Sequence, residues 1–438
     1  SKLFYERFCQ DEDVSLFSPH NVPRLYESFG TPSFDELYTA YEADDTIPRK
    51  TIGAQELILD LLKERAETGR IYIMNIDHCN EHSSFKDKVN MSNLCQEITL
   101  PTDPINHIDG EGEIALCILS AINVGKLRNL DEMEELCDLS VRALEELIDY
   151  QKYPVKAARK STLARRSLGV GYIGLAHYLA KNGVKYDDPE AWKLVHDLTE
   201  AFQYNLLRAS NNIAKEKGAC EYFNRTKYSD GILPIDTYKA DVNEIVPNDL
   251  SFDWKSLRSD IQTYGLRHST LSAQMPSESS SVVSNATNGI EPPRDYLSTK
   301  KSKKGPLKQV VPQVGTLKNN YTLLWDMSSN KGYINIVAVM QKFFDQAISG
   351  NWSYNPENYE NNEVPTSVMA EDLLTTFKYG WKTSYYQNTY DTKSEIDEPS
   401  HSIGWKDNVQ EGGNKTAITN LLDDIFATEE EACDSCSI

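Results

Sequence analysis

Three side chains that could do chemistry together stand at alternate positions of the segment SNLCQEI, residues 92–98. They are the amide of Asn93, the thiol of Cys95 and the carboxylate of Glu97. Side chains on an extended backbone alternate between faces, so we expect these three on one surface and the two residues between them turned away. The competing interpretation is a strand that carries a buried cysteine, which is the commoner situation for any single cysteine.

Three further features of the sequence argue against that competing interpretation. Cys117 lies in a second apolar, strand-like stretch, EGEIALCILSAINVG. The run MPSESSSVVSNATNGIEPPR at 275–294 is unusually polar for the middle of a folded chain, and its hydroxyls and backbone N–H groups could bind an anion. Tyr385 and Tyr386 are adjacent on a strand candidate. Taken singly, a core strand, a loop with N-cap serines and core packing of tyrosines would explain these features equally well.

Composition excludes some classes of function. The chain has 438 residues, 39% of them hydrophobic, which is enough for a large core and about two or three domains. Its net charge of −21 argues against binding to the phosphate backbone of nucleic acids, although a single phosphorylated ligand remains compatible with it. No apolar run approaches the ~20 residues that span a bilayer, and SKLFYERFCQ at the start has no signal-peptide core. Eight cysteines without such a signal favour reduced thiols, and we expect a cytoplasmic protein.

Hydrophobic periodicity predicts long helices that alternate with short strands. The expected helices are 54–69, 129–150, 189–216, 333–349 and 366–380, and the expected strands are 71–76, 93–99, 321–325 and 383–386. Asn129 and Glu132 resemble a capping box at the start of the second helix. The basic segment 298–308 is expected to be a surface loop. The alternation predicts an α/β fold with an internal sheet or barrel.

Two motifs that could suggest other functions are better explained as structure. Residues 169–174, GVGYIG, match the G-x-G-x-x-G dinucleotide fingerprint. That motif needs a hydrophobic strand before it, whereas the preceding KAARKSTLARRSL is basic, so we expect small residues that permit close helix packing. Residues 77–82, DHCNEH, lack the paired Cys-x-x-Cys spacing of a structural zinc site, and we expect a surface loop there.

Taken together, the remaining motifs resemble those of the large catalytic subunit of class I ribonucleotide reductases. NLCQEI resembles the finger-loop motif of that family, and EIALCILSAINVG resembles the strand that carries one of its redox cysteines. PSESSSVVSNATNGIEPPR resembles its substrate-phosphate loop, TSYYQNT its tyrosine pair, and the terminal Cys433 and Cys436 its redox tail. The resemblance covers nearly the whole chain. It implies an α/β fold that is the C-terminal part of a ten-stranded α/β barrel with a finger loop.

The resemblance also implies a thiyl-radical mechanism. Cys95 would become a thiyl radical and take the 3′ hydrogen of a ribonucleoside diphosphate. Glu97 would remove the 3′-hydroxyl proton as general base, and Asn93 would bind the ribose oxygens. The 2′-hydroxyl would leave as water, with reducing equivalents from two thiols, one of them Cys117, that become a disulfide. The product would be the 2′-deoxyribonucleoside diphosphate needed for DNA synthesis.

The implied substrate-binding residues fall in two segments. They are Asn93, Leu94, Cys95, Gln96 and Glu97 in the finger loop, and Pro276, Ser277, Glu278, Ser279 and Ser280 in the phosphate loop. The second segment would bind the diphosphate through backbone N–H groups and hydroxyls, with the Glu278 side chain pointing away from the anion.

No metal or other cofactor is expected on this chain. The resemblance implies that the radical is made on a separate metal-containing small subunit and reaches Cys95 through Tyr385 and Tyr386. Cys433 and Cys436 would reduce the active-site disulfide by thiol exchange at the end of a long polar linker. Thioredoxin or glutaredoxin would then reduce this terminal pair. The expected parts are a barrel portion at 1–387, a linker and short helix at 388–426 and a redox tail at 427–438.

The resemblance is incomplete in one respect. The family needs a second redox cysteine upstream of the finger loop, and none of the other cysteines has the expected context. These cysteines are Cys9, Cys79, Cys137 and Cys220, of which the last two fall on expected helices. The family's N-terminal effector domain and first half-barrel also have no counterpart here, so we expect a half of a naturally split subunit, or an excised fragment, that needs an N-terminal partner portion. The alternatives are an inactive scaffold of the reductase and, on the glycine motif alone, a nicotinamide-dependent oxidoreductase.

Overall fold

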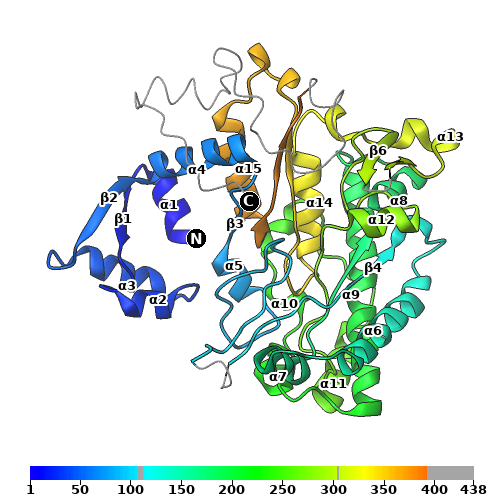
Figure 1. The fold of residues 1–438 in the computed structure, drawn as a ribbon, viewed down its shortest axis with the longest axis horizontal. Helices are drawn as coiled ribbons and strands as arrows, with labels where there is room; N and C mark the ends of the chain where they lie inside the picture. Colours follow the sequence, from blue (N-terminus) through cyan, green and yellow to red (C-terminus); the bar gives the residue numbers. More distant parts are fainter. Residues whose placement is uncertain (107–111, 303–304, 392–438) are drawn as a thin grey trace.

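The computed structural model describes residues 1–106, 112–302 and 305–391 (Figure 1). Its α-helices are α1 Lys2–Gln10, α2 Pro23–Ser28, α3 Ser33–Glu42, α4 Ala54–Thr68, α5 Ile76–Glu81, α6 Glu132–Tyr150, α7 Lys156–Arg165, α8 Leu175–Lys181, α9 Pro189–Lys217, α10 Pro234–Thr237, α11 Trp254–Tyr264, α12 Glu278–Ser284, α13 Val314–Leu317, α14 Lys331–Gln341 and α15 Thr366–Lys378. Its strands are β1 Asp13–Phe17, β2 Arg49–Gly53, β3 Ile73–Met74, β4 Leu119–Asn123, β5 Gly169–Ile173, β6 Leu297–Ser302, β7 Gly305–Val310, β8 Trp352–Tyr354, β9 Thr383–Ser384 and β10 Gln387–Thr389. Most of the expected linker and the tail cysteines Cys433 and Cys436 lie outside the described residues.

Short strand segments from distant parts of the chain lie side by side at the centre of the molecule (Figure 1). β4 pairs in parallel with β5, and β3 pairs antiparallel with β9. The backbone hydrogen bonds that join the segments between these pairs run from Val170 N to Leu271 O, Ala273 N to Val170 O, Gln274 N to Ala347 O, Ser349 N to Gln274 O and Tyr385 N to Gly350 O. β4 has no strand on its other side within the described residues, so the described strands form an open array and no closed barrel.

Helices cover this array and bury most of its apolar side chains. α9 begins with Pro189 after the N-cap residue Asp188 and ends before Gly218. Proline is favoured at the first position of a helix, and glycine is favoured directly after its last residue. α14 packs against α9 and α15 and is buried on all sides from Gly332 to Gln341, which is why its sequence is apolar around its whole circumference.

The first 53 residues form a smaller unit beside the main body, drawn in blue in Figure 1. β1 pairs antiparallel with β2, and α2 and α3 pack together. Val22, Leu25 and Tyr38 make a small apolar core of their own. The Tyr38 hydroxyl also donates to Ser15 O at 2.7 Å, which fastens α3 to β1.

Most expected helices are confirmed, because α4, α6, α9 and α15 lie within two or three residues of the predicted ranges. The helix expected at 333–349 ends at Gln341 instead. The following residues join the strand array, where the Asp345 carboxylate accepts hydrogen bonds from Leu271 N and Ser272 N at 2.9 and 2.8 Å. Buried apolar residues fit a core helix and a core strand equally well, so periodicity could not place this boundary.

Four local expectations are wrong. The segment 93–99 contains a turn and no strand, and 321–325 forms no strand either, because a 3-10 turn begins at Leu324. The expected loop at 298–308 is the antiparallel pair of β6 and β7. The capping box is not formed, since Asp131 is the N-cap residue of α6 and Glu132 accepts from Arg128 N.

The two motifs assigned to structure have other roles than expected. Gly169 and Gly171 lie on buried β5, where a Cβ on Gly171 would come within 2.8 Å of Ala273 O, so a neighbouring strand rather than a helix requires its small size. Gly174 is the N-cap residue of α8 and has a left-handed backbone with φ of 79°. Residues 77–82 belong to buried α5 instead of a surface loop. Cys79 donates to Lys382 O, and the His78 ring lies 2.9 Å from Trp381 O. Across the described ranges no group of three or more His, Cys, Asp or Glu side chains could hold a metal ion.

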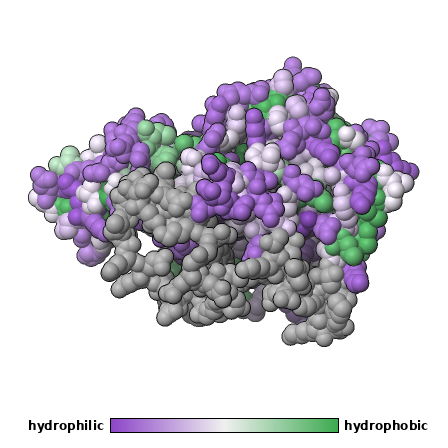
Figure 2. All heavy atoms as spheres, turned by 90° about the horizontal axis from the view of Figure 1, so that it is seen from above, coloured by the Kyte–Doolittle hydropathy of each residue, from purple (hydrophilic) through white to green (hydrophobic). Residues whose placement is uncertain are grey.

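The visible face of the described residues is mostly hydrophilic in Figure 2. Figure 2 shows small apolar patches scattered among polar side chains on the face seen from above. Within the described part of the chain, no helix combines the length and the apolar character needed to cross a membrane.

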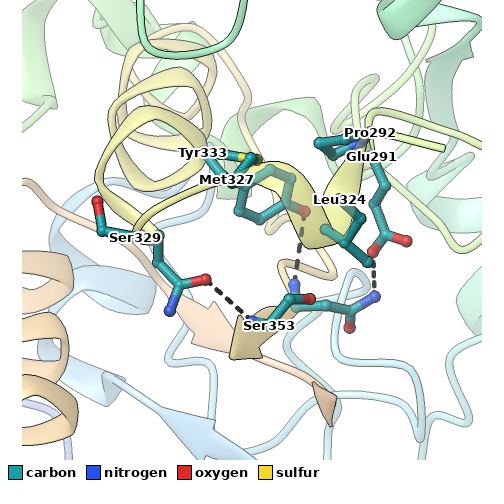
Figure 3. A pocket seen from close by; sticks show the side chains of 9 residues that line it. Glu291, Pro292, Leu324, Met327, Ser329, Tyr333 and Ser353 are labelled. Atoms are coloured by element: carbon teal, nitrogen blue, oxygen red, sulfur yellow. Dashed lines mark hydrogen bonds between the residues drawn. The ribbon is translucent and has the colours of Figure 1, made fainter. Parts of the chain in front are cut away.

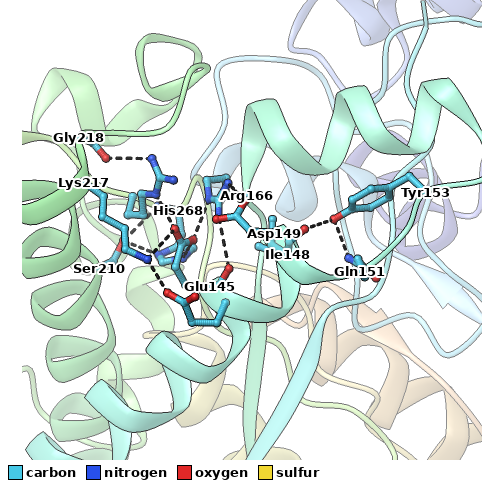
Figure 4. A network of polar contacts seen from close by, with 12 residues as sticks. Glu145, Ile148, Asp149, Gln151, Tyr153, Arg166, Ser210, Lys217, Gly218 and His268 are labelled. Carbon is cyan, nitrogen blue, oxygen red and sulfur yellow. Dashed lines mark hydrogen bonds and ion pairs between the residues drawn. The ribbon is translucent and has the colours of Figure 1, made fainter.

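A buried polar network fastens α6 to the core (Figure 4). The Glu145 carboxylate accepts from Arg166 Nε and Arg267 Nε, both at 2.7 Å, and lies 3.1 Å from His268 Nε2. Burial raises the pKa of Glu145, but these hydrogen bonds outweigh burial and hold it well below its ordinary value. The ionised carboxylate is therefore part of the folded state.

Glu145→Gln is expected to lower the free energy of unfolding by about 3 kcal/mol, because it leaves buried cations without their anion. Glu145 stabilises the fold fully above the ordinary glutamate pKa of about 4.3, and this contribution is lost as the pH falls below it. Urea denaturation at pH 7 measures the loss. Glu146→Gln is the matched control, since that exposed side chain pairs only with Lys217 and should cost less than about 1 kcal/mol. Equal losses for both variants would contradict the network's role.

Candidate active site

The turn that carries Cys95 is shaped by its own polar groups. Gln96 N donates to Asn93 O, and Ile98 N donates to the Asn93 side-chain oxygen, both at 3.1 Å. Gln96 adopts a left-handed backbone with φ of 66°, which closes the turn. The structure thus replaces the expected alternation by a turn, and yet Asn93, Cys95 and Glu97 still converge.

Asn93 connects the carboxylate to the second thiol. Its Nδ2 donates to Glu97 Oε2 at 2.8 Å and to Cys117 Sγ at 3.6 Å. Cys117 stands two residues before β4, so it approaches the turn from the open edge of the strand array. Amide, carboxylate and both thiols therefore form one site.

Ser349 fixes the backbone of the same turn from the neighbouring segment. Its hydroxyl donates to Cys95 O at 2.5 Å and lies 3.4 Å from Glu97 Oε2. Ala347 N also donates to Glu97 O at 3.0 Å. The reactive side chains are thus held from below by a rigid, buried strand segment.

A pair of tyrosines leads away from the thiol. Tyr385 OH donates to Cys95 Sγ at 3.6 Å, and the rings of Tyr385 and Tyr386 are 4.0 Å apart between centroids. Burial, followed by the contacts with Tyr386 and Cys95, raises the pKa of Tyr385. The phenol nearest to Cys95 is therefore neutral and able to exchange a hydrogen atom.

The electrostatics favour protonated thiols. Burial raises the pKa of Cys95 against a smaller opposing effect of the Tyr385 hydroxyl. Partial desolvation and then the Glu97 charge raise the pKa of Cys117. Burial also raises the pKa of Glu97, with hydrogen bonds from Asn93 and Ser349 opposing it. The site can therefore offer S–H groups beside a carboxyl group, rather than thiolate nucleophiles.

The predicted phosphate segment begins at the start of α12. Ser277 is the buried N-cap residue of this helix, whereas Pro276, Ser279 and Ser280 are exposed. Gln274, two residues before Pro276, accepts a hydrogen bond at its backbone oxygen from Ser349 N. Ser349 is also the residue whose hydroxyl holds the Cys95 turn. The predicted phosphate and thiol segments therefore share one supporting residue.

Two residues of the predicted substrate set have distinct surroundings. The Leu94 side chain is 76% exposed at the tip of the turn. Gln96 is buried, and its amide nitrogen lies 3.1 Å from both Ser384 O and Ile73 O in the orientation that satisfies these carbonyls. The Gln96 side chain thus joins the turn to β3 and β9.

A small pocket is lined by Glu291, Tyr333 and Ser353, among other residues (Figure 3). Asn351, one of its lining residues, accepts from Tyr386 N at 3.0 Å and donates to Glu291. Glu291 lies near the end of the polar run at 275–294, which contains the predicted phosphate segment. Burial raises the pKa of Glu291, with the Arg294 charge opposing it.

The other described cysteines lie away from this site. Cys9 is exposed on α1, which packs on α4 and β1. Cys79 and Cys137 are buried and donate to Lys382 O and Phe202 O. Cys220 is buried in the loop after α9, not on a helix as expected. All six cysteines of the described ranges are free thiols.

Sequence reasoning missed Tyr72, Ser349 and Arg65, which surround the predicted residues. Tyr72 packs on both tyrosines of the pair, and Arg65 Nη1 donates to Tyr385 O at 2.9 Å. Tyr72 lies in the expected strand 71–76, and the tyrosine pair lies in the expected strand 383–386. The sequence alone could not predict that these two strands pair in the register that brings Tyr72 to the tyrosine pair.

Comparisons with known proteins agree with these motifs. The sequence model of the family described as "Ribonucleotide reductase, barrel domain" matches residues 1–387. The ribonucleoside-diphosphate reductase subunit alpha of Haemophilus influenzae is 58% identical over 404 residues, which is 91% of this chain and 53% of that protein. The ribonucleoside-diphosphate reductase 1 subunit alpha of Escherichia coli is 54% identical over 397 residues, 89% of this chain and 52% of that protein. The subunit alpha of Enterobacteria phage T4 is 43% identical over 399 residues, again 89% and 52%. The chain therefore spans about half the length of the curated relatives it matches.

Proposed function

Because the chain belongs to the family of ribonucleotide reductase barrel domains, we propose that it is the C-terminal catalytic portion of a ribonucleoside-diphosphate reductase alpha subunit. The observation that carries the proposal is the convergence of Cys95, Glu97, Cys117 and Tyr385 within one site. Its fold would complete the family's ten-stranded barrel through the open edge of β4.

The proposed reaction converts a ribonucleoside diphosphate into the 2′-deoxy compound and water. Cys95 as a thiyl radical takes the 3′ hydrogen, and Glu97 takes the proton of the 3′ hydroxyl. The 2′ hydroxyl leaves as water, and Cys117 with a second thiol supplies two electrons and two protons as the pair becomes a disulfide. Cys95 then returns the hydrogen atom to C3′ and regains its radical, and Glu97 returns its proton to the 3′ oxygen. Asn93, already bonded to Glu97, is suited to hold the ribose hydroxyls in line.

The diphosphate is assigned to residues 276–280. First-turn N–H groups of a helix have no intrahelical acceptor, and the hydroxyls of Ser279 and Ser280 are exposed beside them. The finger-loop backbone from Asn93 to Glu97 would close the other side of the substrate. This assignment rests on the family motif. It is supported by Ser349, which donates hydrogen bonds both to Gln274 O, just before the phosphate segment, and to Cys95 O in the finger loop.

The radical would arrive from a metal-containing small subunit through Tyr386 and then Tyr385. Each step moves one hydrogen atom, so that Tyr385 loses its hydroxyl hydrogen to a Tyr386 radical and takes the sulfur hydrogen of Cys95. Cys433 and Cys436, on the redox tail proposed at 427–438 behind a linker at 388–426, would reduce the active-site disulfide. Thioredoxin or glutaredoxin would reduce them in turn.

The thiol that pairs with Cys117 is assigned to the part of the relatives that this chain does not span. Cys79, Cys137 and Cys220 are buried elsewhere, and Cys9 lies on α1. An inactive scaffold remains the second candidate, although no observation favours it. The dinucleotide alternative has no support, because Gly169 and Gly171 of its motif are buried inside β5.

Reconstitution with CDP tests the proposal. We expect no deoxycytidine product from this chain alone, because the second thiol and the radical source would be missing. Adding the remaining portion of the alpha subunit, a radical-bearing small subunit and a dithiol reductant should give catalytic turnover, measured by chromatography of the nucleotides. Turnover by the chain alone, or none in the full mixture with a small subunit proven to hold its radical, would refute it.

A further inference from the structure

Tyr72 lies directly before β3 and packs against both proposed radical tyrosines. In the antiparallel pair of β3 and β9, Ile73 faces Ser384, so the next residues outward are Tyr72 and Tyr385. The ring centroid of Tyr72 lies 4.7 Å from that of Tyr385 and 5.7 Å from that of Tyr386. The three phenols therefore form one aromatic cluster, which we call the tyrosine cluster.

One buried arginine holds the backbone of the whole tyrosine cluster. Arg65 on α4 donates to Tyr385 O at 2.9 Å and to Tyr386 O at 3.2 Å. It also donates to Ile71 O, next to Tyr72, and its guanidinium lies 4.7 Å from the Trp352 ring. Because a single planar cation binds both segments, Tyr72 and the pair move as one unit.

The hydroxyl of Tyr72 takes part in the cluster as well as its ring. Burial raises the pKa of Tyr72 to about 12, and the neighbouring Tyr386 and Tyr385 hydroxyls influence this pKa in opposite directions. Tyr72 thus stays a neutral phenol that can both donate and accept.

We propose that Tyr72 is a positioning residue for radical transfer, which holds the Tyr385 hydroxyl in the orientation that faces Cys95. The inference rests on the proposed function. The step it serves breaks the S–H bond of Cys95 and forms the O–H bond of Tyr385, so one electron and one proton move together. The Tyr385 oxygen and the Cys95 sulfur are 3.6 Å apart, and the transfer needs the Tyr385 oxygen to face the S–H bond of Cys95.

Tyr72→Phe tests the proposal, since it keeps the ring and removes only the hydroxyl. In the reconstituted enzyme we expect kcat to fall about tenfold, the effect of one lost hydrogen bond, with KM for CDP unchanged. Tyr5→Phe is the matched control, because it removes another buried tyrosine hydroxyl, bonded to Asn75, outside the tyrosine cluster. That control should keep its kcat.

A second measurement needs no turnover. In the full chain with Tyr385→3-nitrotyrosine, the Tyr72 hydroxyl should donate to the nitrophenolate and stabilise it. Adding Tyr72→Phe should therefore move the absorbance titration midpoint to higher pH, by about 0.5 or more. Adding Tyr5→Phe should not.

An unchanged kcat or an unchanged titration midpoint in Tyr72→Phe would overturn the proposal. A drop in kcat shared equally by Tyr5→Phe would do the same, because it would indicate general destabilisation. Failure of the proposed function is a separate result, recognised when Cys95→Ser retains activity. The nitrophenol titration would then still decide whether Tyr72 contacts Tyr385.

Discussion

Cys95→Ser is expected to abolish nucleotide reduction in the reconstituted enzyme. Serine is close in size, and the backbone contact from Ser349 to residue 95 does not involve the sulfur, so the turn should keep its shape. An alcohol O–H bond is much stronger than a thiol S–H bond, so Tyr385 could not withdraw hydrogen from serine. We expect product formation to fall by at least about 10⁴-fold, as for loss of an essential reacting group. Chromatography of CDP and its deoxy product measures the loss.

The control for this variant is Cys9→Ser, an exposed cysteine on α1 outside the site. It should retain the full rate. Circular dichroism and thermal unfolding of Cys95→Ser should match those of the parent chain, which separates lost chemistry from lost structure. Substantial turnover by a correctly folded Cys95→Ser would show that residue 95 does not carry the radical.

The protonation of the site supports hydrogen-atom chemistry over nucleophilic chemistry. Catalytic cysteine nucleophiles lie in surroundings that lower the thiol pKa. Here burial raises the pKa of Cys95, and desolvation with the Glu97 charge raises that of Cys117. Both thiols therefore keep their hydrogen at neutral pH. In the proposed mechanism, Cys95 exchanges that hydrogen with Tyr385, and the hydrogen of Cys117 is part of the reducing equivalents.

Long helices were predictable from the sequence because each repeats its apolar face over several turns. α4 ends at Thr68 because Gly69 adopts a left-handed backbone with φ of 68°, which its sequence position already indicated. α9 likewise begins at the Asp188–Pro189 signal. These features depend on neighbouring residues alone, and the structure confirms them.

Short elements were not predictable, because distant contacts decide them. Residues 93–97 alternate as a strand would, yet the left-handed Gln96 and the Asn93 side chain close a turn. Residues 77–82 are polar enough for a loop, yet backbone carbonyls at 381 and 382 bind the buried His78 and Cys79. Neither partner can be recognised from its sequence position.

The predicted site also contains residues that the sequence could identify and residues that only the fold could identify. The resemblance to ribonucleotide reductases indicated Cys95, Cys117 and the tyrosine pair, because their motifs match those of the family in type and order. Tyr385 reaches Cys95 across 290 residues of chain, and Ser349 reaches it across 254. Supporting residues such as Ser349 carry no distinctive motif, so only the fold could identify them.

Glu97→Gln is expected to lower kcat for CDP reduction by about 10²- to 10⁴-fold, the range for loss of a general base. Glutamine keeps the size of the side chain and can still accept from Asn93, whose Nδ2 lies 2.8 Å from Glu97 Oε2. It cannot take the proton of the 3′ hydroxyl. Binding of CDP should therefore change little, and steady-state kinetics should show the loss in kcat rather than in KM.

The pH profile gives this prediction its sharpest form. A general base must be ionised, so activity should rise with pH through the Glu97 pKa, which burial raises above the ordinary glutamate value against opposing bonds from Asn93 and Ser349. That acidic limb should disappear in Glu97→Gln, while Glu132→Gln, at a partly exposed residue paired with Arg128 at the start of α6, should preserve it. If Glu97→Gln keeps the acidic limb at reduced rate, the proton is removed by another group, and Glu97 only supports the position of Asn93.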